Sequence, residues 1–221
     1  MAQAYTPGPL CSSSSLPIDT GTASRTCNSA PGPVCNYLNT CEPINQSIPN
    51  GYATSSLTLG PDGIKLLKEV ENIALNPYDD QTQTSITQWV KGATIGYGHL
   101  ISKEDWGKYK NGISQKEADE LFSTDMSAPI NAVREAIQVG LQQNQFDALV
   151  IFAFNIGVER TGFRGSSVVK MINNPSIKTN YPTLETAWKA WNKSQGKAMK
   201  GLDNRRNCEW DIYSKAIYKA W

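Results

Sequence analysis

Three side chains near the middle of the chain have the chemistry needed to cleave a glycosidic bond. Glu71 lies in a segment of helical periodicity, Asp80 follows it in an Asp-Asp pair, and Thr94 opens the glycine-rich segment at residues 94–99. Hydrolysis of such a bond needs a proton donor on one side and a group that positions water on the other. A carboxyl group can supply the proton, and a carboxylate with a hydroxyl can hold the water. Glu71, Asp80 and Thr94 are therefore the candidate catalytic residues.

A helix must carry Glu71, because apolar residues recur at helical spacing around it. They are Ile64, Leu67, Val70, Ala74 and Leu75. We expect this helix to begin at Pro61 and to end at Asn76-Pro77, since proline disfavours helical geometry in the residue before it. Glu71 lies beside the apolar stripe, where partial desolvation favours the protonated carboxyl that a general acid needs. The alternative is an ordinary glutamate at the edge of a helix surface.

Two strand-like segments follow and predict a small lobe that contains a β-hairpin. Residues 85–90 alternate in part between apolar and polar, Lys91-Gly92 supplies a turn, and residues 94–100 form the second strand. Gly96 and Gly98 would let the backbone approach a ligand closely or take positive φ. Their alternative role is a simple bend at the edge of the sheet.

The remainder of the chain is predicted to be helical. Ser114 and Glu117 form a capping box, and Pro129 marks the start of another helix. Residues 146–157 are apolar nearly all round, which indicates a buried central helix. Amphipathic helices are expected at residues 184–191 and 207–221. The pattern predicts an α+β fold, with a small hairpin lobe, a larger helical lobe and a cleft between them.

Residues 1–60 have a different composition from the rest of the chain. They hold seven of the twelve prolines, few charges, and the cysteines Cys11, Cys27, Cys35 and Cys41. Such a segment can scarcely bury a core, so two disulfides of unknown pairing are expected, with free thiols or a zinc site as alternatives. We predict an extension with little regular structure at 1–60, linked by residues 51–60 to a domain at 61–221. Cys208 is expected to be a buried free thiol.

Charge and hydropathy restrict the partners of the chain. Residues 186–221 carry eight basic against three acidic side chains, which suits a polyanionic bacterial wall or, equally, a solvated helix surface. No nucleic-acid motif is present. No apolar run is long enough to span a bilayer, and residues 1–9 lack the features of an export signal. We therefore expect synthesis in the cytoplasm and delivery to the periplasm or cell wall by other machinery.

Residues 61–221 resemble the phage-type lysozyme family, glycoside hydrolase family 24. The likeness is carried by Glu71, Tyr78-Asp79-Asp80, residues 94–99, residues 112–122, residues 154–157, Phe163 with Ser166, and residues 201–206 followed by Glu209. The resemblance implies a lysozyme fold and hydrolysis of the β-1,4 bond between N-acetylmuramic acid and N-acetylglucosamine in peptidoglycan. It implies no metal and no organic cofactor.

By the same resemblance, Glu71 protonates the glycosidic oxygen, Asp80 orders the attacking water and Thr94 holds that water. Eight residues separate Glu71 from Asp80, an interval similar to that of the family, which favours Asp80 over Asp79. Thirteen residues separate Asp80 from Thr94, which is more than the family usually has. An enlarged hairpin is the simplest explanation of this longer interval.

The resemblance also implies that Leu100, Phe154 and Ser166 line the sugar groove, although core packing is an equal alternative for Phe154. It pairs His99 with Asp125 at the lobe interface. Arg205 and Arg206 are expected to brace the final helices. The helical spacing of several tryptophans favours core packing over stacking on sugars. They are Trp188, Trp191, Trp210 and Trp221.

Two rival functions can be distinguished from hydrolysis by their products. A lytic transglycosylase keeps the acid, dispenses with positioned water and leaves anhydro-sugar ends. A noncatalytic wall-binding or spike module binds glycan without cleaving it. We expect a monomer whose partner is peptidoglycan, with a phage tail, holin-dependent release or a secretion apparatus as the delivery route. An immunity protein is a further candidate partner, and both a phage lysis protein and an antibacterial effector remain open.

Overall fold

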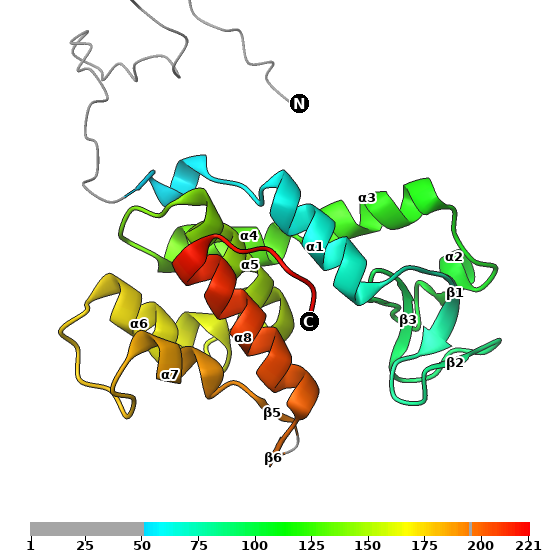
Figure 1. The fold of residues 1–221 in the computed structure, drawn as a ribbon. Helices are drawn as coiled ribbons and strands as arrows, with labels where there is room; N and C mark the ends of the chain where they lie inside the picture. Colours follow the sequence, from blue (N-terminus) through cyan, green and yellow to red (C-terminus); the bar gives the residue numbers. More distant parts are fainter. Residues whose placement is uncertain (1–50, 195) are drawn as a thin grey trace, which may run out of the picture. The chain divides into compact units, whose positions relative to one another are not determined.

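The computed structural model describes residues 51–194 and 196–221 (Figure 1). The predictions for residues 1–50, including the disulfides of the four N-terminal cysteines, lie outside these residues. Helices and a small antiparallel sheet make up the described chain, so the α+β class is confirmed. None of the helices in the described ranges is long and apolar enough to cross a membrane.

The elements follow the chain in a simple order. The helices are η1 (Thr54–Ser56), α1 (Pro61–Glu71), α2 (Trp106–Tyr109), α3 (Gln115–Asp125), α4 (Ser127–Ala136), α5 (Gln143–Ile156), η2 (Phe163–Gly165), α6 (Ser167–Asn173), α7 (Leu184–Lys189) and α8 (Lys200–Lys215). The strands are β1 (Ala74–Asp79), β2 (Thr84–Ser85), β3 (Ala93–Gly96), β4 (His99–Leu100), β5 (Lys193–Ser194) and β6 (Lys197–Ala198). The larger sheet has the order β2-β1-β3-β4, and β5 pairs with β6.

Helix α1 ends at Glu71, five residues before the predicted end. Asn72 takes a φ of 53°, which stops the helix and turns the chain into β1. The prediction that the helix runs to Asn76-Pro77 is therefore wrong. Pro77 lies inside β1, where the register with β3 shifts between Ala74 and Tyr78. An irregular stretch of this kind tolerates a residue that has no N–H to donate. Glu71 thus lies at the junction of the helix and the sheet.

The predicted strand at residues 85–90 is mostly wrong, because only Ser85 belongs to a strand. Ile86, Trp89 and Val90 instead pack against an apolar cluster beneath the sheet. The Trp89 indole N–H donates to the carbonyl of Ile101 at 2.9 Å. A side-chain hydrogen bond, instead of regular strand pairing, therefore holds this part of the segment. Local alternation alone could not reveal this packing.

Residues 94–100 form a second hairpin instead of one strand. Strands β3 and β4 pair with each other, and residues 96–98 make the turn between them. Gly96 and Gly98 have φ values of 67° and 95°, so the expectation that they take positive φ is confirmed. Side chains other than glycine rarely adopt such values.

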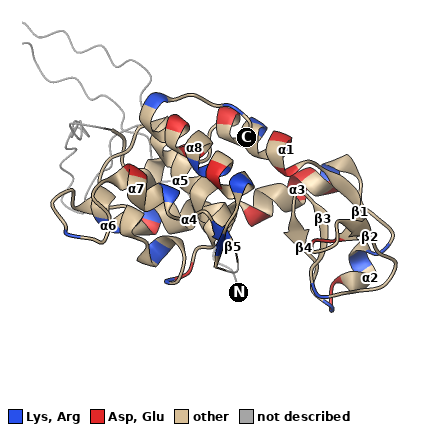
Figure 2. Ribbon diagram, turned by 60° about the horizontal axis from the view of Figure 1, so that its bottom comes forward, with Lys and Arg blue, Asp and Glu red and all other residues tan. Residues whose placement is uncertain are grey.

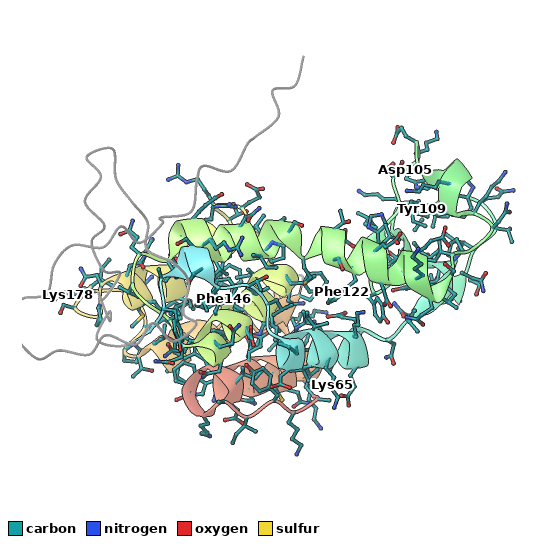
Figure 3. The ribbon with its side chains drawn as sticks, turned by 90° about the horizontal axis from the view of Figure 1, so that it is seen from above. Lys65, Asp105, Tyr109, Phe122, Phe146 and Lys178 are labelled. Carbon is teal, nitrogen blue, oxygen red and sulfur yellow. The ribbon has the colours of Figure 1, made fainter. Side chains whose placement is uncertain are left out.

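The helical lobe is built around α5, as predicted, with its residues 146–153 buried. Figure 3 shows Phe146 of α5 among the helices of this lobe and Phe122 of α3 between it and the small lobe. The capping box of Ser114 and Glu117 at the start of α3 is confirmed. Helix α8 begins seven residues before the predicted Asn207 and ends at Lys215, because Ala216 has a left-handed φ of 56°.

Residues 51–60 pack against the helical lobe instead of forming an exposed linker. Tyr52 pairs with Leu141, and Leu57 and Leu59 are buried. The Arg134 guanidinium donates to the Leu57 carbonyl from two nitrogens, at 2.9 and 2.7 Å. The chain before α1 is therefore part of the lobe that holds this helix in place.

A buried carboxylate ties α8 to the rest of the lobe. Glu209 is fully buried, and it accepts hydrogen bonds from the Trp188 indole at 2.9 Å and from Arg206 at 2.8 Å. Arg205 donates to the same carboxylate at 3.3 Å. Burial opposes both charges, since it raises the pKa of Glu209 and lowers that of Arg206. The bonds among these groups offset that cost.

We predict that Glu209→Gln lowers the free energy of unfolding by about 3–5 kcal/mol, because two buried arginines lose their shared counter-charge. Urea unfolding followed by circular dichroism measures this change. Asp211→Asn is the matched control, since Asp211 pairs with Lys215 on the exposed side of the same helix. The control should change stability by less than about 1 kcal/mol. Equal effects of the two variants would contradict the role given to Glu209.

We predict that Ala216→Gly stabilises the protein by about 1 kcal/mol, because glycine removes the strain of a left-handed residue. Ala216 is exposed, so little packing is lost. Ala53→Gly serves as control, because Ala53 is also exposed but has an ordinary φ of −57°. The control should be neutral or destabilising in thermal and urea unfolding. A loss of stability in Ala216→Gly would count against this account of how α8 ends.

Candidate active site

A groove of about 410 Å³ lies between the end of α1 and the larger sheet. It is lined by Glu71, residues 72–76, Tyr78, Gln83, Ser85 and Gly96. Its floor is therefore the turn from α1 into β1, and one wall is the hairpin side of the small lobe. Of the predicted catalytic residues, only Glu71 lines this groove directly.

Glu71 is held in place by an arginine of the helical lobe. The Arg205 guanidinium of α8 donates to Glu71 Oε1 at 2.8 Å. The side chain of Glu71 is 23% exposed and that of Arg205 is 10% exposed. The pair joins the last residue of α1 to the buried Glu209, which Arg205 also contacts. The orientation of the Glu71 carboxyl is thus fixed by the packing of α8.

Tyr78 shares the groove with Glu71. Its pKa is raised, first by burial and then by the negative charges of Asp80 and Glu71.

Asp79 and Asp80 have different surroundings, although they are neighbours in the chain. Asp79 closes the turn after β1, because its two carboxylate oxygens accept from the Gln81 N–H at 2.9 Å and the Thr82 hydroxyl at 3.0 Å. Asp80 is exposed and accepts a bond from the Gln81 amide. The Asp80 carboxylate thus accepts one side-chain bond, whereas that of Asp79 accepts the two bonds that close the turn.

The sheet brings Asp80 and Thr94 to one backbone carbonyl. Tyr78 pairs with Thr94 and Asp79 with Ala93, and just past β1 the Asp80 N–H donates to the Gly92 carbonyl at 3.0 Å. The Thr94 hydroxyl donates to the same Gly92 carbonyl at 3.0 Å. Although the interval between Asp80 and Thr94 is long, both residues therefore bond to the same backbone carbonyl.

The three residues predicted to line a sugar groove have different positions. Leu100 pairs with Thr94 in the sheet and is 63% exposed. Phe154 lies on α5 and packs partly buried against the main core. Ser166 is 3% exposed and caps α6, where its hydroxyl accepts from the Val169 N–H at 3.2 Å. None of the three lines the groove beside Glu71, and their contact with sugar stays a prediction.

The expected pair of His99 and Asp125 is confirmed. His99 Nδ1 lies 3.0 Å from Asp125 Oδ1, and so it ties β4 to the end of α3. The expected packing role is confirmed for Trp188, which is fully buried. Arg205 and Arg206 are also buried, so two of the basic residues counted near the chain end add nothing to a basic surface. Figure 2 shows the other charges of both signs interspersed along the helices.

Sequence reasoning missed several residues of this region. Arg205 is 134 positions from Glu71, and no local pattern relates them. Gln83 and Ser85 line the groove because of the unexpected course of residues 80–92. A larger hollow of about 690 Å³ lies among residues 139–145, 171–184 and Tyr213 of the helical lobe. It contains none of the candidate catalytic residues.

The arrangement has the parts needed for acid-catalysed cleavage. Glu71 lines a groove, and in the adjoining sheet the Asp80 N–H and the Thr94 hydroxyl both bond to the Gly92 carbonyl. The Thr94 hydroxyl donates its hydrogen to Gly92 and keeps its lone pairs for a hydrogen bond from water. Such a set can protonate a leaving oxygen on one side and orient water on the other.

Comparison with known proteins identifies the family of the chain. The phage lysozyme family profile matches residues 68–209. The endolysin of Bacillus phage PZA is 35% identical over 157 residues, which are 71% of this chain and 55% of that protein. The chain spans about half the length of the two Bacillus phage endolysins that it matches.

Two solved structures share the fold over most of their own length. An endolysin from Escherichia coli O157:H7 phage FAHEc1 has a TM-score of 0.57 at 28% identity, and the match covers 74% of this chain and 98% of that one. The muramidase domain of SpmX from Asticaccaulis excentricus has a TM-score of 0.56 at 26% identity, with 72% and 99% covered. Since the family profile covers more than half of the sequence, from the last turn of α1 to Glu209 in α8, the chain belongs to the phage lysozyme family.

Proposed function

We propose that this protein is a peptidoglycan hydrolase that acts on the bacterial cell wall. In finer detail, we propose an N-acetylmuramidase that cleaves the β-1,4 bond between N-acetylmuramic acid and N-acetylglucosamine. Family membership supports the activity, and the names of the related endolysins and muramidase domain support the substrate. The observation that carries the proposal is the groove that Glu71 lines, beside the part of the sheet where Asp80 and Thr94 bond to one carbonyl.

In the proposed reaction, protonated Glu71 gives its proton to the glycosidic oxygen as the bond from that oxygen to the sugar C1 breaks. Water attacks C1 from the opposite face, and Asp80 accepts the proton that the water loses. The Thr94 hydroxyl accepts a hydrogen bond from the other O–H of this water. The two bonds together orient a lone pair of the water oxygen toward C1. Attack from the face opposite the leaving group inverts the anomeric centre. Arg205 holds the Glu71 carboxyl toward the groove.

The three residues predicted to contact the substrate differ in how freely they could do so. Leu100 is exposed next to Thr94, so its backbone is well situated to contact a sugar. Phe154 and Ser166 already have packing and capping contacts in the helical lobe. We propose Leu100 as the first of these three residues to test for glycan binding.

A second candidate is a lytic transglycosylase, in which the sugar closes on its own C6 hydroxyl and no water is needed. Two observations favour keeping this candidate: Asp80 does not line the groove, and Thr94 is only 4% exposed. Both candidates require Glu71 as the proton donor. They differ in their dependence on Asp80 and in the chemistry of the product ends.

We predict that Glu71→Gln lowers the rate of peptidoglycan cleavage by about 10²–10⁴-fold, because the amide cannot donate a proton as an acid does. Release of new glycan ends from purified peptidoglycan measures the rate, and circular dichroism verifies the fold. Glu69→Gln is the matched control, since Glu69 is exposed on the same helix. Wild-type turnover in Glu71→Gln would remove Glu71 from the mechanism.

We predict that Asp80→Asn lowers hydrolysis by about 10²-fold, because the water loses its proton acceptor. Asp79→Asn is the matched control, since Asp79 bonds within the turn, and its effect should be much smaller. Mass spectrometry of the digested peptidoglycan should find reducing ends. Anhydro-sugar ends with near-normal activity in Asp80→Asn would instead establish a transglycosylase. Binding without cleavage by the wild-type protein would leave only a wall-binding module.

A further inference from the structure

The segment at residues 216–221 folds back beside the helix that precedes it. Ala216 takes the left-handed conformation, its N–H donates to the Ile212 carbonyl at 3.0 Å, and the chain reverses direction. Figure 1 shows this segment returning along α8 on the side of α1. The segment thus runs toward the junction where α1 ends at Glu71.

The returning segment is fixed by a partly buried hydrogen bond halfway along its length. The Tyr218 hydroxyl donates to Asp147 of α5 at 2.7 Å, and burial raises the pKa of that phenol. The same Asp147 carboxylate accepts from the Gly60 N–H at 2.8 Å, just before α1 begins. One carboxylate therefore joins the returning segment, the central helix and the start of α1.

Beyond this tie, the Trp221 ring lies against the arginine that holds Glu71. The centre of the Arg205 guanidinium is 4.7 Å from the Trp221 ring centroid, which is a cation–π contact. The edges of the same guanidinium are engaged by Glu71 at 2.8 Å and by Glu209 at 3.3 Å. Hydrogen bonds therefore hold two nitrogens of the guanidinium, and the indole ring packs against the same group.

We propose that Trp221 is a positioning residue for the candidate acid and acts through Arg205. The indole covers a face of the guanidinium, keeps water from it and so holds the orientation in which Arg205 donates to Glu71. Trp221 does not line the groove, so it makes no contact that would bind sugar there. The inference rests on the proposed function, in which Glu71 is the proton donor.

The geometry predicts a particular kinetic effect. Without the indole, Arg205 keeps its bond to Glu209 but gains freedom to leave Glu71. Fewer molecules then hold the carboxyl in the reactive orientation, so kcat falls while KM is little changed. A ring that served only for packing would change thermal stability and leave the kcat of the folded protein as it was.

The test compares Trp221→Leu with Trp221→Phe in the full chain, using a soluble peptidoglycan oligomer as substrate. We expect Trp221→Leu to lower kcat about 3–10-fold, the range that loss of a cation–π contact of this strength corresponds to. Trp221→Phe keeps an aromatic face and should restore kcat to within about twofold. Tyr218→Phe is the control for loosening of the segment without loss of the indole. Wild-type kcat in Trp221→Leu, or no rescue by phenylalanine, would overturn the inference.

A double-mutant cycle with Arg205→Lys identifies the route of the effect. If the indole acts through the guanidinium, Trp221→Leu should have no further effect on kcat once Arg205→Lys is present. Multiplied losses in the double variant would show that Trp221 acts by another route and would overturn the inference.

A second readout needs no catalysis, so the two proposals can fail separately. In the wild-type protein the Arg205 Nε–H resonance should be shifted by the indole ring current and protected from exchange with water. Trp221→Leu should abolish the ring-current shift, while the protection of this N–H should largely remain, because it bonds to the buried Glu209. If wild-type protein cleaves no glycan but these effects are present, the proposed function fails while the contact stands. If Glu71→Gln is inactive and Trp221→Leu changes neither kcat nor the resonance, only the inference about Trp221 fails.

Discussion

The arrangement of the site depends on the buried carboxylate of Glu209. It holds Arg205 and Arg206 on α8, and it accepts a hydrogen bond from Trp188 on α7. Arg205 extends this network to Glu71 at the end of α1. The candidate acid is therefore oriented by charges on α8 that have little access to water. An ion pair removed from solvent fixes geometry better than one on the surface, where water competes for both partners.

The sheet side of the site depends on backbone geometry instead of charge. The Gly92 carbonyl accepts from the Asp80 N–H and from the Thr94 hydroxyl, so one oxygen brings together residues separated by thirteen positions. The residues of this interval form β2 and the turn that Asp79 closes. An insertion is tolerated at such a place because it lies in the connection between β1 and β3, outside the pairs Tyr78–Thr94 and Asp79–Ala93.

Sequence reasoning identified the parts whose causes are local or carried by a motif. The capping box at Ser114, the buried helix α5 and the positive φ at Gly96 follow from residue type and periodicity. It failed where tertiary contacts override local preference. Asn72 ends α1 before the apolar periodicity does, and Trp89 draws residues 86–90 out of a regular strand. The contact of Arg205 with Glu71 could not be predicted, because it depends on how α8 packs across the lobe junction.

Arg206 places a charged guanidinium in the interior of the helical lobe. Its guanidinium lies 5.0 Å from the Phe152 ring centroid, and its Nη2 bonds to Asn155 and Glu209. Its Nε and Nη1 atoms are buried without a hydrogen-bond partner among the described residues. Unsatisfied buried donors are rare and costly, so a water molecule that reached them would be stabilised. When the contact between α5 and α8 loosens, water should enter the interior of the lobe first at this cation, ahead of the apolar side chains around it.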